Sequence, residues 1–455
     1  MGANGTPIAV DDNMKKAAAN VRTTSSLEQA CTRSLVDPNL SPAQVKLVRT
    51  IDRANDKDAA HRAISAFFQG DDTTHDGRKP SGLMTDLLME CLPRFVHSQR
   101  GFIIHAIDFS NEDIVPAQVR YVEVNGESRP VLQGGFLFIE TPNERAIVCL
   151  NRDVMGWDEP LCRLGIVSNK DASQFLASWE AFARRDNYLK NRAFFPDGTL
   201  WQHNRRYMWD DVILPVEAVT TIRRHTEEFL ERRATLRRAG IKLRRGLMLE
   251  GPPGTGKTLL CKVLADQINA SLMWITPQHV RSVQLFARHL EVARFVAPTI
   301  VFLEDIDLYA EEREARNSIL LGELMGQLDG VTDNDDLIII ASTNRLHAVE
   351  QALRNRPGRF DRIIHFGALD EDCRRRLLDR LLKNASIHDS DRAQLIESTD
   401  GYTGAQLEEL TNTLYMLAAE TEVDDADTST RLGRSLIQRA LDDVGIQPKN
   451  PIGFK

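Results

Sequence analysis

The residues of this chain best suited to chemistry form a glycine-rich octapeptide, residues 251–258, with the sequence GPPGTGKT. It matches the pattern G-x-x-x-x-G-K-[ST] at every fixed position. Glycines let backbone N–H groups approach phosphate oxygens, Lys257 can reach β- and γ-phosphates, and Thr258 can place its hydroxyl on Mg²⁺. The octapeptide therefore predicts a site for a nucleoside triphosphate with Mg²⁺. The predicted nucleotide-binding residues are Gly251, Pro252, Pro253, Gly254, Thr255, Gly256, Lys257 and Thr258.

The segments on either side of the octapeptide predict the two elements that must hold it. Residues 247–249 are apolar and predict the end of a strand, and residues 259–264 predict the first turns of a helix. The N-terminus of such a helix adds positive potential, which favours bound phosphate.

Polar side chains follow two further apolar runs, residues 299–303 and residues 337–341. Both runs are typical of buried parallel strands, whose carboxyl ends are where open α/β sheets bind ligands. The first run ends in Glu304, Asp305 and Asp307, and one carboxylate can hold Mg²⁺ while the next orients an attacking water. The second run is followed by Asn344, which can lie beside the γ-phosphate.

Together these motifs resemble the AAA family of ATPases, over about residues 209–445. The segments that carry the resemblance are residues 251–258, 299–307, 341–344, 356–362 and 401–407. The resemblance implies ATP as the nucleotide, ATP hydrolysis and an assembly of several subunits. It also places Asp211, Gly404 and Ala405 near the adenine.

In this family the arginines that match Arg359 and Arg362 reach the nucleotide of the neighbouring subunit. There they act as arginine fingers, which offset charge on the transferred phosphoryl group. The resemblance therefore implies catalytic roles for both arginines and a ring of identical subunits, expected to be a hexamer. A local alternative makes them surface ion-pair partners of Asp361.

The carboxylate pair departs from the usual family order, since Glu304 precedes Asp305. By register, Glu304 takes the metal position, for which Thr258 is the other predicted ligand, and Asp305 takes the water-polarising position. Asp305 is one methylene shorter than the usual glutamate, and a small misplacement can lower a rate greatly. Hydrolysis is therefore expected, with a rate that Asp305 can reduce.

The same inverted order occurs in the AAA branch that includes the mitochondrial translocase of the Rieske iron–sulfur protein. Residues 239–246 resemble the arginine-rich approach to the octapeptide in that branch, and residues 209–214 lack the paired glycines common elsewhere. An aromatic–aliphatic–glycine loop, the peptide grip of many AAA unfoldases, is missing after the run at residues 272–276. We interpret Trp274, inside that run, as a sheet-core residue.

Composition suits a water-soluble globular protein: of 455 residues, 42% are hydrophobic and 27% charged, and the formal net charge is -8. The charge predicts no general attraction to nucleic acid or to an anionic membrane. Six cysteines without a C-x-x-C pair are expected to be free thiols in a reducing compartment. With no apolar leader and no run of about 18 apolar residues, we expect a cytoplasmic protein without a membrane partner.

The expected fold is an α/β P-loop ATPase core with a doubly wound parallel sheet, a C-terminal helical lid and an N-terminal α+β domain. Residues 42–69 and 83–96 are predicted to be helical, residues 70–77 a loop, and two hairpins are expected around residues 125–126 and 142–144. The expected domains are a flexible tail at 1–45, a recognition domain at 46–170, a helical linker at 171–208, the ATPase core at 209–368, and the lid with a C-terminal tail at 369–455.

The resemblance to AAA remodelling machines implies an ATP-driven machine that remodels or translocates a protein partner held by the N-terminal domain. A nucleic-acid-acting ATPase is the first alternative, because residues 223–245 are rich in arginine. We favour solvated helices there, with arginines paired to Glu227, Glu228 and Glu231, since aromatic residues are sparse. The second alternative is a switch or scaffold that binds ATP and hydrolyses it slowly.

Overall fold

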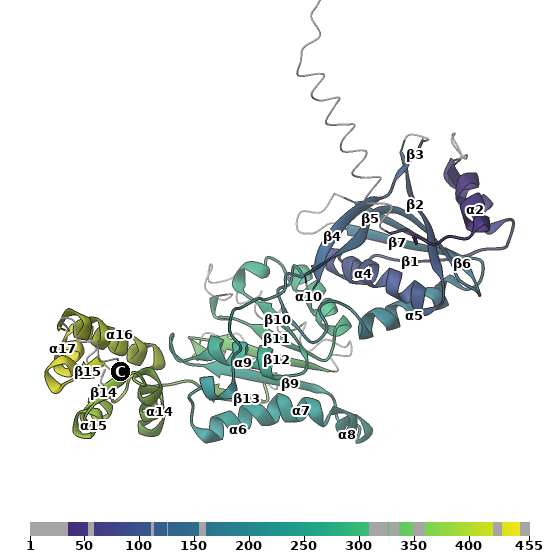
Figure 1. Ribbon diagram of the computed structural model, residues 1–455. Coiled ribbons are helices and arrows are strands. Elements are labelled where there is room, and N and C mark those ends of the chain that lie inside the picture. Colours follow the sequence, from purple (N-terminus) through teal and green to yellow (C-terminus); the bar gives the residue numbers. More distant parts are fainter. Residues whose placement is uncertain are drawn as a thin grey trace, which may run out of the picture. The chain divides into compact units, whose positions relative to one another are not determined.

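The computed structural model describes residues 35–52, 59–110, 113–124, 126–153, 161–308, 326, 336–347, 349, 360–421 and 430–445 (Figure 1). The chain divides into two compact units, Met1–Lys190 and Asn191–Lys455.

The first unit is built on an antiparallel sheet of seven strands. Its strand order is β1-β7-β6-β5-β2-β3, and β4 pairs with the long strand β5. The strands are β1 (Thr74–Arg78), β2 (Phe102–Ser110), β3 (Asp113–Pro116), β4 (Gln118–Val124), β5 (Glu127–Glu140), β6 (Arg145–Asp153) and β7 (Leu161–Ser168).

Strand β5 takes part in both predicted hairpins. Its first part pairs with β4, with Leu132 opposite Val119, and its last part pairs with β6, with Phe138 opposite Ile147. The two hairpins are therefore confirmed, but one continuous strand connects them. The predicted loop at residues 70–77 was wrong in its second half, because β1 pairs with β7 at the sheet edge. A polar sequence can form this strand because most of its side chains are exposed.

Helices cover this sheet. Helices α2 (Pro42–Asp52) and α3 (Ala59–Phe68) bury Ile51 and Phe67 against Phe138 and Ile147 of the sheet. Helices α4 (Gly82–Ser98) and α5 (Ala172–Arg185) pack on each other and on the sheet. The indole N–H of Trp179, on α5, donates to the carbonyl of Leu88 on α4 at 3.1 Å. The N-terminal α+β architecture is confirmed.

The second unit holds a six-stranded parallel sheet with the order β13-β9-β12-β11-β10-β8. Its strands are β8 (Ala193–Phe194), β9 (Arg244–Glu250), β10 (Ser271–Ile275), β11 (Thr299–Leu303), β12 (Leu337–Thr343) and β13 (Arg362–His365). Every residue of β10, β11 and β12 is buried, as expected when helices cover both faces of a parallel sheet. This agrees with the predicted α/β core.

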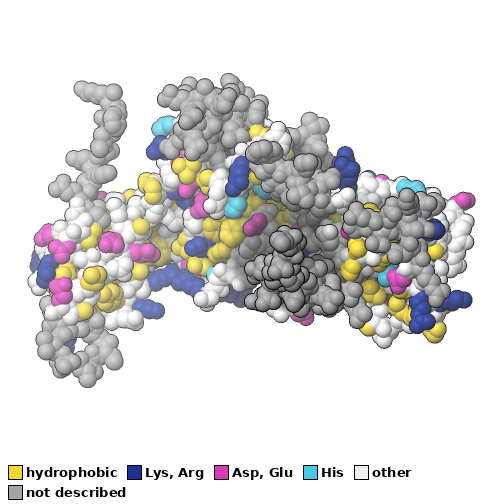
Figure 2. Space-filling view, turned by 90° about the horizontal axis from the view of Figure 1, so that it is seen from above, with side chains coloured by type: hydrophobic (Ala, Val, Ile, Leu, Met, Phe, Trp, Pro, Cys, Tyr) yellow, Lys and Arg dark blue, Asp and Glu magenta, His cyan; other side chains and the backbone are white. Residues whose placement is uncertain are grey.

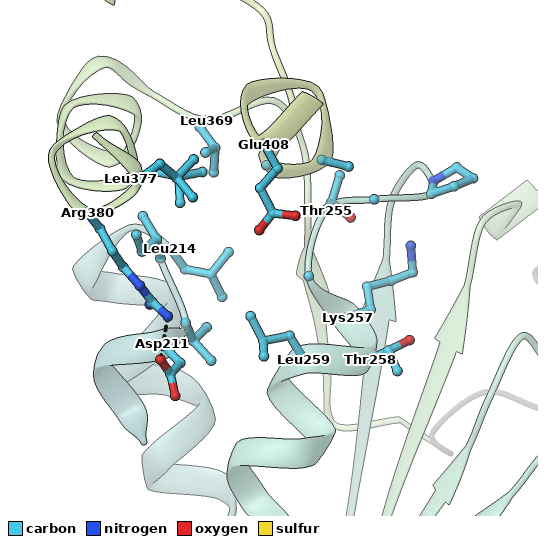
Figure 3. Close-up of a pocket in the computed structure, with 18 of the residues that line it drawn as sticks. Asp211, Leu214, Thr255, Lys257, Thr258, Leu259, Leu369, Leu377, Arg380 and Glu408 are labelled. Carbon is cyan, nitrogen blue, oxygen red and sulfur yellow. Dashed lines mark hydrogen bonds and ion pairs between the residues drawn. The ribbon is translucent and has the colours of Figure 1, made fainter. Parts of the chain in front are cut away.

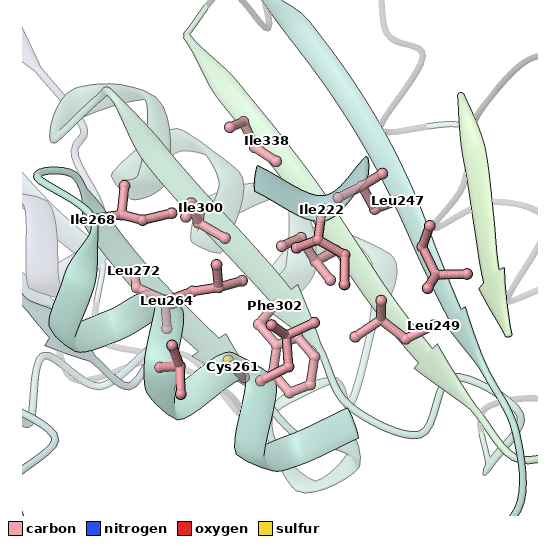
Figure 4. Close-up of a cluster of buried hydrophobic side chains, with 14 of the residues drawn as sticks. Ile222, Leu247, Leu249, Cys261, Leu264, Ile268, Leu272, Ile300, Phe302 and Ile338 are labelled. Atoms are coloured by element: carbon pink, nitrogen blue, oxygen red, sulfur yellow. The ribbon is translucent and has the colours of Figure 1, made fainter. Parts of the chain in front are cut away.

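Helices α9 (Lys257–Gln267) and α10 (Val283–Phe295) connect these strands, and η1 (Trp209–Asp211) and η2 (Pro277–His279) are single 3-10 turns. One apolar cluster joins the sheet to α9, with Phe302 of β11, Ile338 of β12 and Leu264 of α9 among its members (Figure 4). This core fixes the strand ends from which the functional side chains project.

The lid has an apolar core of its own. It consists of α14 (Glu371–Leu381), α15 (Asp389–Ser398), α16 (Gly404–Thr421) and α17 (Arg434–Val444), with the short strands β14 (Ala385–Ile387) and β15 (Thr430–Leu432). Leu377, Leu395, Leu407 and Leu414 are buried together. The predicted helical lid is confirmed.

The helical prediction for residues 171–208 was only half right. Helix α5 ends at Arg185, and residues 193–194 form β8, which extends the sheet beside β10. Pro196 and Gly198 disfavour helix here, and a turn returns the chain so that the N–H of Trp201 donates to the carbonyl of Ala193.

The arginine-rich segment forms α6 (Val216–His225), α7 (Glu227–Glu231) and α8 (Arg233–Arg238). Arg223 pairs with Glu227 at 2.8 Å, and Arg232 pairs with Glu228 at 3.1 Å, as the favoured interpretation requires. On the face shown in Figure 2, basic and acidic side chains are interspersed over the described part of the chain. Among the described residues, no helix is both long and apolar enough to span a bilayer.

Substitution of two isoleucines of the core sheet, one on β12 and one on β13, tests how the sheet is packed. Ile338→Ala, at a fully buried site on a central strand, should lower the free energy of unfolding of the second unit by about 2–5 kcal/mol. Ile363→Ala, on the edge strand β13 and 41% exposed, is the matched control and should cost about 0.5 kcal/mol or less. Denaturant unfolding measures both, and equal losses would contradict the described core.

Candidate nucleotide-binding site

The glycine-rich octapeptide connects β9 to α9 as a tight loop. Gly254 and Gly256 have φ angles of 76° and 96°, which side-chain-bearing residues rarely adopt. A Cβ at Gly254 would lie 2.6 Å from the Cβ of Ala405, so this position also requires the absence of a side chain. The loop ends at the N-terminus of α9, where free backbone N–H groups and the helix dipole favour an anion.

A cavity of about 450 Å³ lies between this loop, residues 211–214 and the lid (Figure 3). Its lining includes eleven of the predicted site residues: Asp211, Pro253, Gly254, Thr255, Gly256, Lys257, Thr258, Asp305, Asn344, Gly404 and Ala405. Such a volume suits a nucleotide. Of the other predicted residues, Gly251, Pro252, Glu304 and Arg362 do not line it, and Arg359 lies outside the described residues.

The ammonium group of Lys257 is buried and bound by three oxygens. It donates to the carbonyls of Gly251 at 2.6 Å and Pro252 at 2.8 Å, and to Oδ1 of Asn344 at 2.9 Å. Burial lowers the pKa of Lys257, while nearby carboxylates, first among them Asp305, act in the opposite direction. Lys257 therefore ties the loop to the end of β12.

The carboxylate of Glu304 lies directly beside the start of α9. Its Oε1 accepts from the hydroxyl of Thr258 at 2.9 Å, and its Oε2 accepts from the indole N–H of Trp274 at 2.9 Å. A hydroxyl and a carboxylate are hard oxygen donors of the kind that Mg²⁺ binds. The two residues predicted to hold the metal are thus adjacent and chemically suited to it. The sequence analysis did not predict the hydrogen bond from Trp274, because it assigned this residue only to the core of the sheet.

Asp305 adopts a left-handed backbone conformation, with φ of 46°. Its N–H donates to the hydroxyl of Ser342 at 3.0 Å, and its Oδ1 accepts from Nδ2 of Asn344 at 3.2 Å. Burial raises the pKa of Asp305, and the neighbouring carboxylates of Glu304 and Asp307 raise it further. Asn344 thus bridges Lys257 and Asp305, which can hold a water-orienting carboxylate in a fixed place.

Asp307 has a structural task that the sequence did not reveal. It is 2% exposed, and its Oδ1 accepts from the hydroxyl of Thr343 at 2.8 Å and from the N–H of Asn344 at 3.1 Å. Buried carboxylates need such partners. Asp307 therefore fixes the end of β12, from which Asn344 projects.

Asp211, near the start of the ATPase core, connects the preceding segment that contains Arg205 to the lid. Its carboxylate accepts from Arg380 of α14 at 2.6 Å (Figure 3) and pairs with Arg205 at 2.7 Å. Burial acts to raise the pKa of Asp211, but hydrogen bonds from Met208 and Arg205 lower it overall. On the lid side, the N–H of Ala405 donates to the carbonyl of Gly254 at 3.0 Å. These contacts place the lid at the mouth of the cavity.

Several cavity residues were missed by the sequence interpretation. Leu214, Leu369 and Leu377 form an apolar part of the cavity wall, and Arg380 and Glu408 add charged side chains to it. Apart from Gly404 and Ala405, residues 369–455 were predicted only as a lid and C-terminal tail, without a part in the cavity. Arg362 lies on the edge strand β13, is exposed, and donates to the carbonyl of Asp361 at 3.1 Å.

Comparison with known proteins agrees with this geometry. Residues 247–368 match the family described as "ATPase family associated with various cellular activities (AAA)". That range contains the octapeptide, the carboxylate pair and Asn344. The resemblance to the branch with the inverted carboxylate order stays a prediction.

Three relatives illustrate the similarity. ATP-dependent zinc metalloprotease FtsH 2 of Thermoanaerobacter sp. is 30% identical over 53% of this chain and 47% of its own length. A cell division cycle protein 48 homolog of Archaeoglobus fulgidus is 36% identical over 42% of this chain and 27% of its own length. Proteasome-activating nucleotidase 2 of Haloferax volcanii is 33% identical over 48% of this chain and 57% of its own length.

The chain thus spans between about a quarter and three fifths of the length of these relatives. The matches and the cavity lead to the same conclusion: the second unit of this chain contains a P-loop ATPase domain of the AAA family.

Proposed function

We propose that this protein is an ATP-hydrolysing AAA machine that remodels or translocates a protein partner through a ring assembly. The observation that carries the proposal is the convergence of Lys257, Thr258, Glu304, Asp305 and Asn344 on one edge of the parallel sheet. The carboxyl edge of such a sheet is where α/β proteins bind nucleotides.

In the proposed reaction, phosphate oxygens accept hydrogen bonds from the backbone N–H groups of residues 254–258. Lys257 exchanges its carbonyl partners for the β- and γ-phosphates, whose negative charge makes them stronger acceptors. Thr258 and Glu304 would hold Mg²⁺, which neutralises charge on the phosphates. Asp305 orients the attacking water, and Asn344 keeps that carboxylate beside the γ-phosphate.

The lid would convert the nucleotide state into movement. It contributes Arg380, Gly404, Ala405 and Glu408 to the cavity, and Arg380 pairs with Asp211 across the cavity entrance. A nucleotide between these groups would contact core and lid at once. Binding and release of ATP would therefore change the position of the lid relative to the sheet.

The proposed assembly is a homo-oligomeric ring, a hexamer, with Arg359 and Arg362 as arginine fingers for the neighbouring subunit. The exposed position of Arg362 on an edge strand suits a role outside its own cavity. The relatives' names include a protease and a proteasome activator, which supports a protein as the partner. We propose that residues 46–170 recognise the protein partner and that the protein acts in the cytoplasm.

A slow-hydrolysing switch is the second candidate, because the short Asp305 sits in a left-handed backbone conformation and is held by Asn344. The nucleic-acid alternative has less support, since Arg223 of α6 and Arg232, between α7 and α8, are paired with glutamates.

The first prediction concerns nucleotide binding. Lys257→Met should weaken ATP affinity at least about tenfold, because it removes charge-assisted hydrogen bonds to phosphate. Lys262→Met is the matched control on the same helix, where the ammonium lies 5.6 Å from the ring of Tyr207. Calorimetric titration with ATP and Mg²⁺ measures both. Equal affinities in the two variants would exclude the proposed site.

The second prediction concerns the ring. Specific ATPase activity should rise with protein concentration, and Arg359→Ala should lower kcat by about a thousandfold or more. Mixing Arg359→Ala with Lys257→Met subunits should restore part of the activity, because one subunit supplies the nucleotide site and the other the arginine. Activity that is independent of concentration and survives Arg359→Ala would rule out shared sites.

The third prediction separates the machine from the switch. For the machine, Asp305→Glu should change kcat by less than about tenfold, since the native carboxylate already orients water. For the switch, restoring the missing methylene should raise kcat by roughly a hundredfold, the scale of a 1 Å misplacement. Steady-state phosphate release at saturating ATP distinguishes the two results.

A further inference from the structure

Trp274 makes a polar contact that sheet packing does not require. It lies on β10 opposite Phe302 of β11 and is 5% exposed. Its Nε1 donates to Oε2 of Glu304 at 2.9 Å, while the other oxygen, Oε1, accepts from Thr258 at 2.9 Å. Each oxygen of this carboxylate therefore has its own donor, and the two bonds together define the plane of the carboxylate.

The indole is suited to this task because it combines a rigid apolar body with one N–H donor. A phenylalanine could fill the same apolar space, but it would leave Oε2 of Glu304 without this bond. Hydrogen bonds to a carboxylate are stronger than those between neutral groups. The contact therefore favours one orientation of Glu304, the one in which Oε1 faces the hydroxyl of Thr258.

Aromatic rings hold the indole itself. The ring of Phe302 meets Trp274 edge-on with centroids 5.5 Å apart. The rings of Trp201 and Phe195 lie 5.6 Å and 6.4 Å from it. Both belong to the segment around β8, the strand that pairs with β10. The N–H of Trp201 donates to the carbonyl of Ala193 and so closes this segment into a turn. Rings on several sides restrict the rotation of the indole.

We infer that Trp274 is a positioning residue for the metal-binding carboxylate of Glu304. By holding Oε2, it keeps Oε1 directed at the hydroxyl of Thr258, and these two residues would hold Mg²⁺. Residues 193–201 take part because Phe195 and Trp201 hold the indole in the orientation that this hydrogen bond needs. The inference rests on the proposed function, since it assigns a role within the same nucleotide site.

Trp274→Phe tests the inference in the full-length protein. The variant keeps a ring in the core and removes the N–H, so the Mg²⁺ concentration that half-saturates ATP hydrolysis should rise about 10–100-fold, as when a ligand's hydrogen-bond partner is lost. Binding of ATP without Mg²⁺ should be unchanged, because Lys257 and the loop are intact. Trp179→Phe is the matched control, because Trp179 is a buried tryptophan of the first unit whose indole N–H donates to Leu88, and it should change half-saturation by less than about threefold.

A spectroscopic readout separates orientation from packing. In the wild type, adding Mg²⁺ to the ATP-bound protein should change tryptophan emission, because the metal polarises the carboxylate that Trp274 contacts. Trp274→Phe should lose this change, and Trp179→Phe should keep it. If Trp274→Phe does not fold, as judged by circular dichroism, Glu304→Ala replaces it and should abolish the same change with the indole in place.

Two results would count against these claims in different ways. Unchanged Mg²⁺ half-saturation in a folded Trp274→Phe protein, or an emission change that survives Glu304→Ala, would mean that Trp274 serves packing alone. A wild-type protein that binds neither ATP nor Mg²⁺ would refute the proposed function instead.

Discussion

The site depends above all on one buried ammonium group. Lys257 has two loop carbonyls and the side chain of Asn344 as partners, all within 2.9 Å. A buried charge without partners would be too costly to keep, so these oxygens fix both the lysine and the shape of the loop. Because neutral carbonyls are weaker acceptors than phosphate, the same group is stabilised in the fold and still available to a nucleotide.

Through Asn344 the lysine is linked to the rest of the proposed chemistry. Asn344 contacts Asp305, and Asp307 fixes the backbone of Asn344. A phosphate that draws Lys257 away would therefore free Oδ1 of Asn344 next to Asp305, the carboxylate proposed to orient water. Neighbouring strand β11 also supplies Glu304, so nucleotide, metal and water would be handled by side chains on adjacent strand ends. The order of buried strands in the sheet makes this arrangement possible.

Local patterns explain which features the sequence could predict. The phosphate-binding role of the octapeptide and the buried strands follow from residue type and spacing, and the helical lid agrees with the resemblance to the AAA family; the core and lid were correctly predicted. Strands β1 and β8 were missed because polar or very short segments become strands only by pairing with a distant edge. The contacts of Arg380 with Asp211 and of Trp274 with Glu304 join residues 169 and 30 positions apart, which no local pattern encodes.

The most direct test is a crystal structure of the protein with Mg²⁺ and a non-hydrolysable ATP analogue. The account predicts the nucleotide in the cavity between the octapeptide and the lid, with Nζ of Lys257 on the β- and γ-phosphates and no longer on the carbonyl of Pro252. It also predicts Mg²⁺ beside Thr258 and Glu304. A nucleotide bound elsewhere, or phosphates out of reach of a Lys257 still bound to its loop carbonyls, would contradict it.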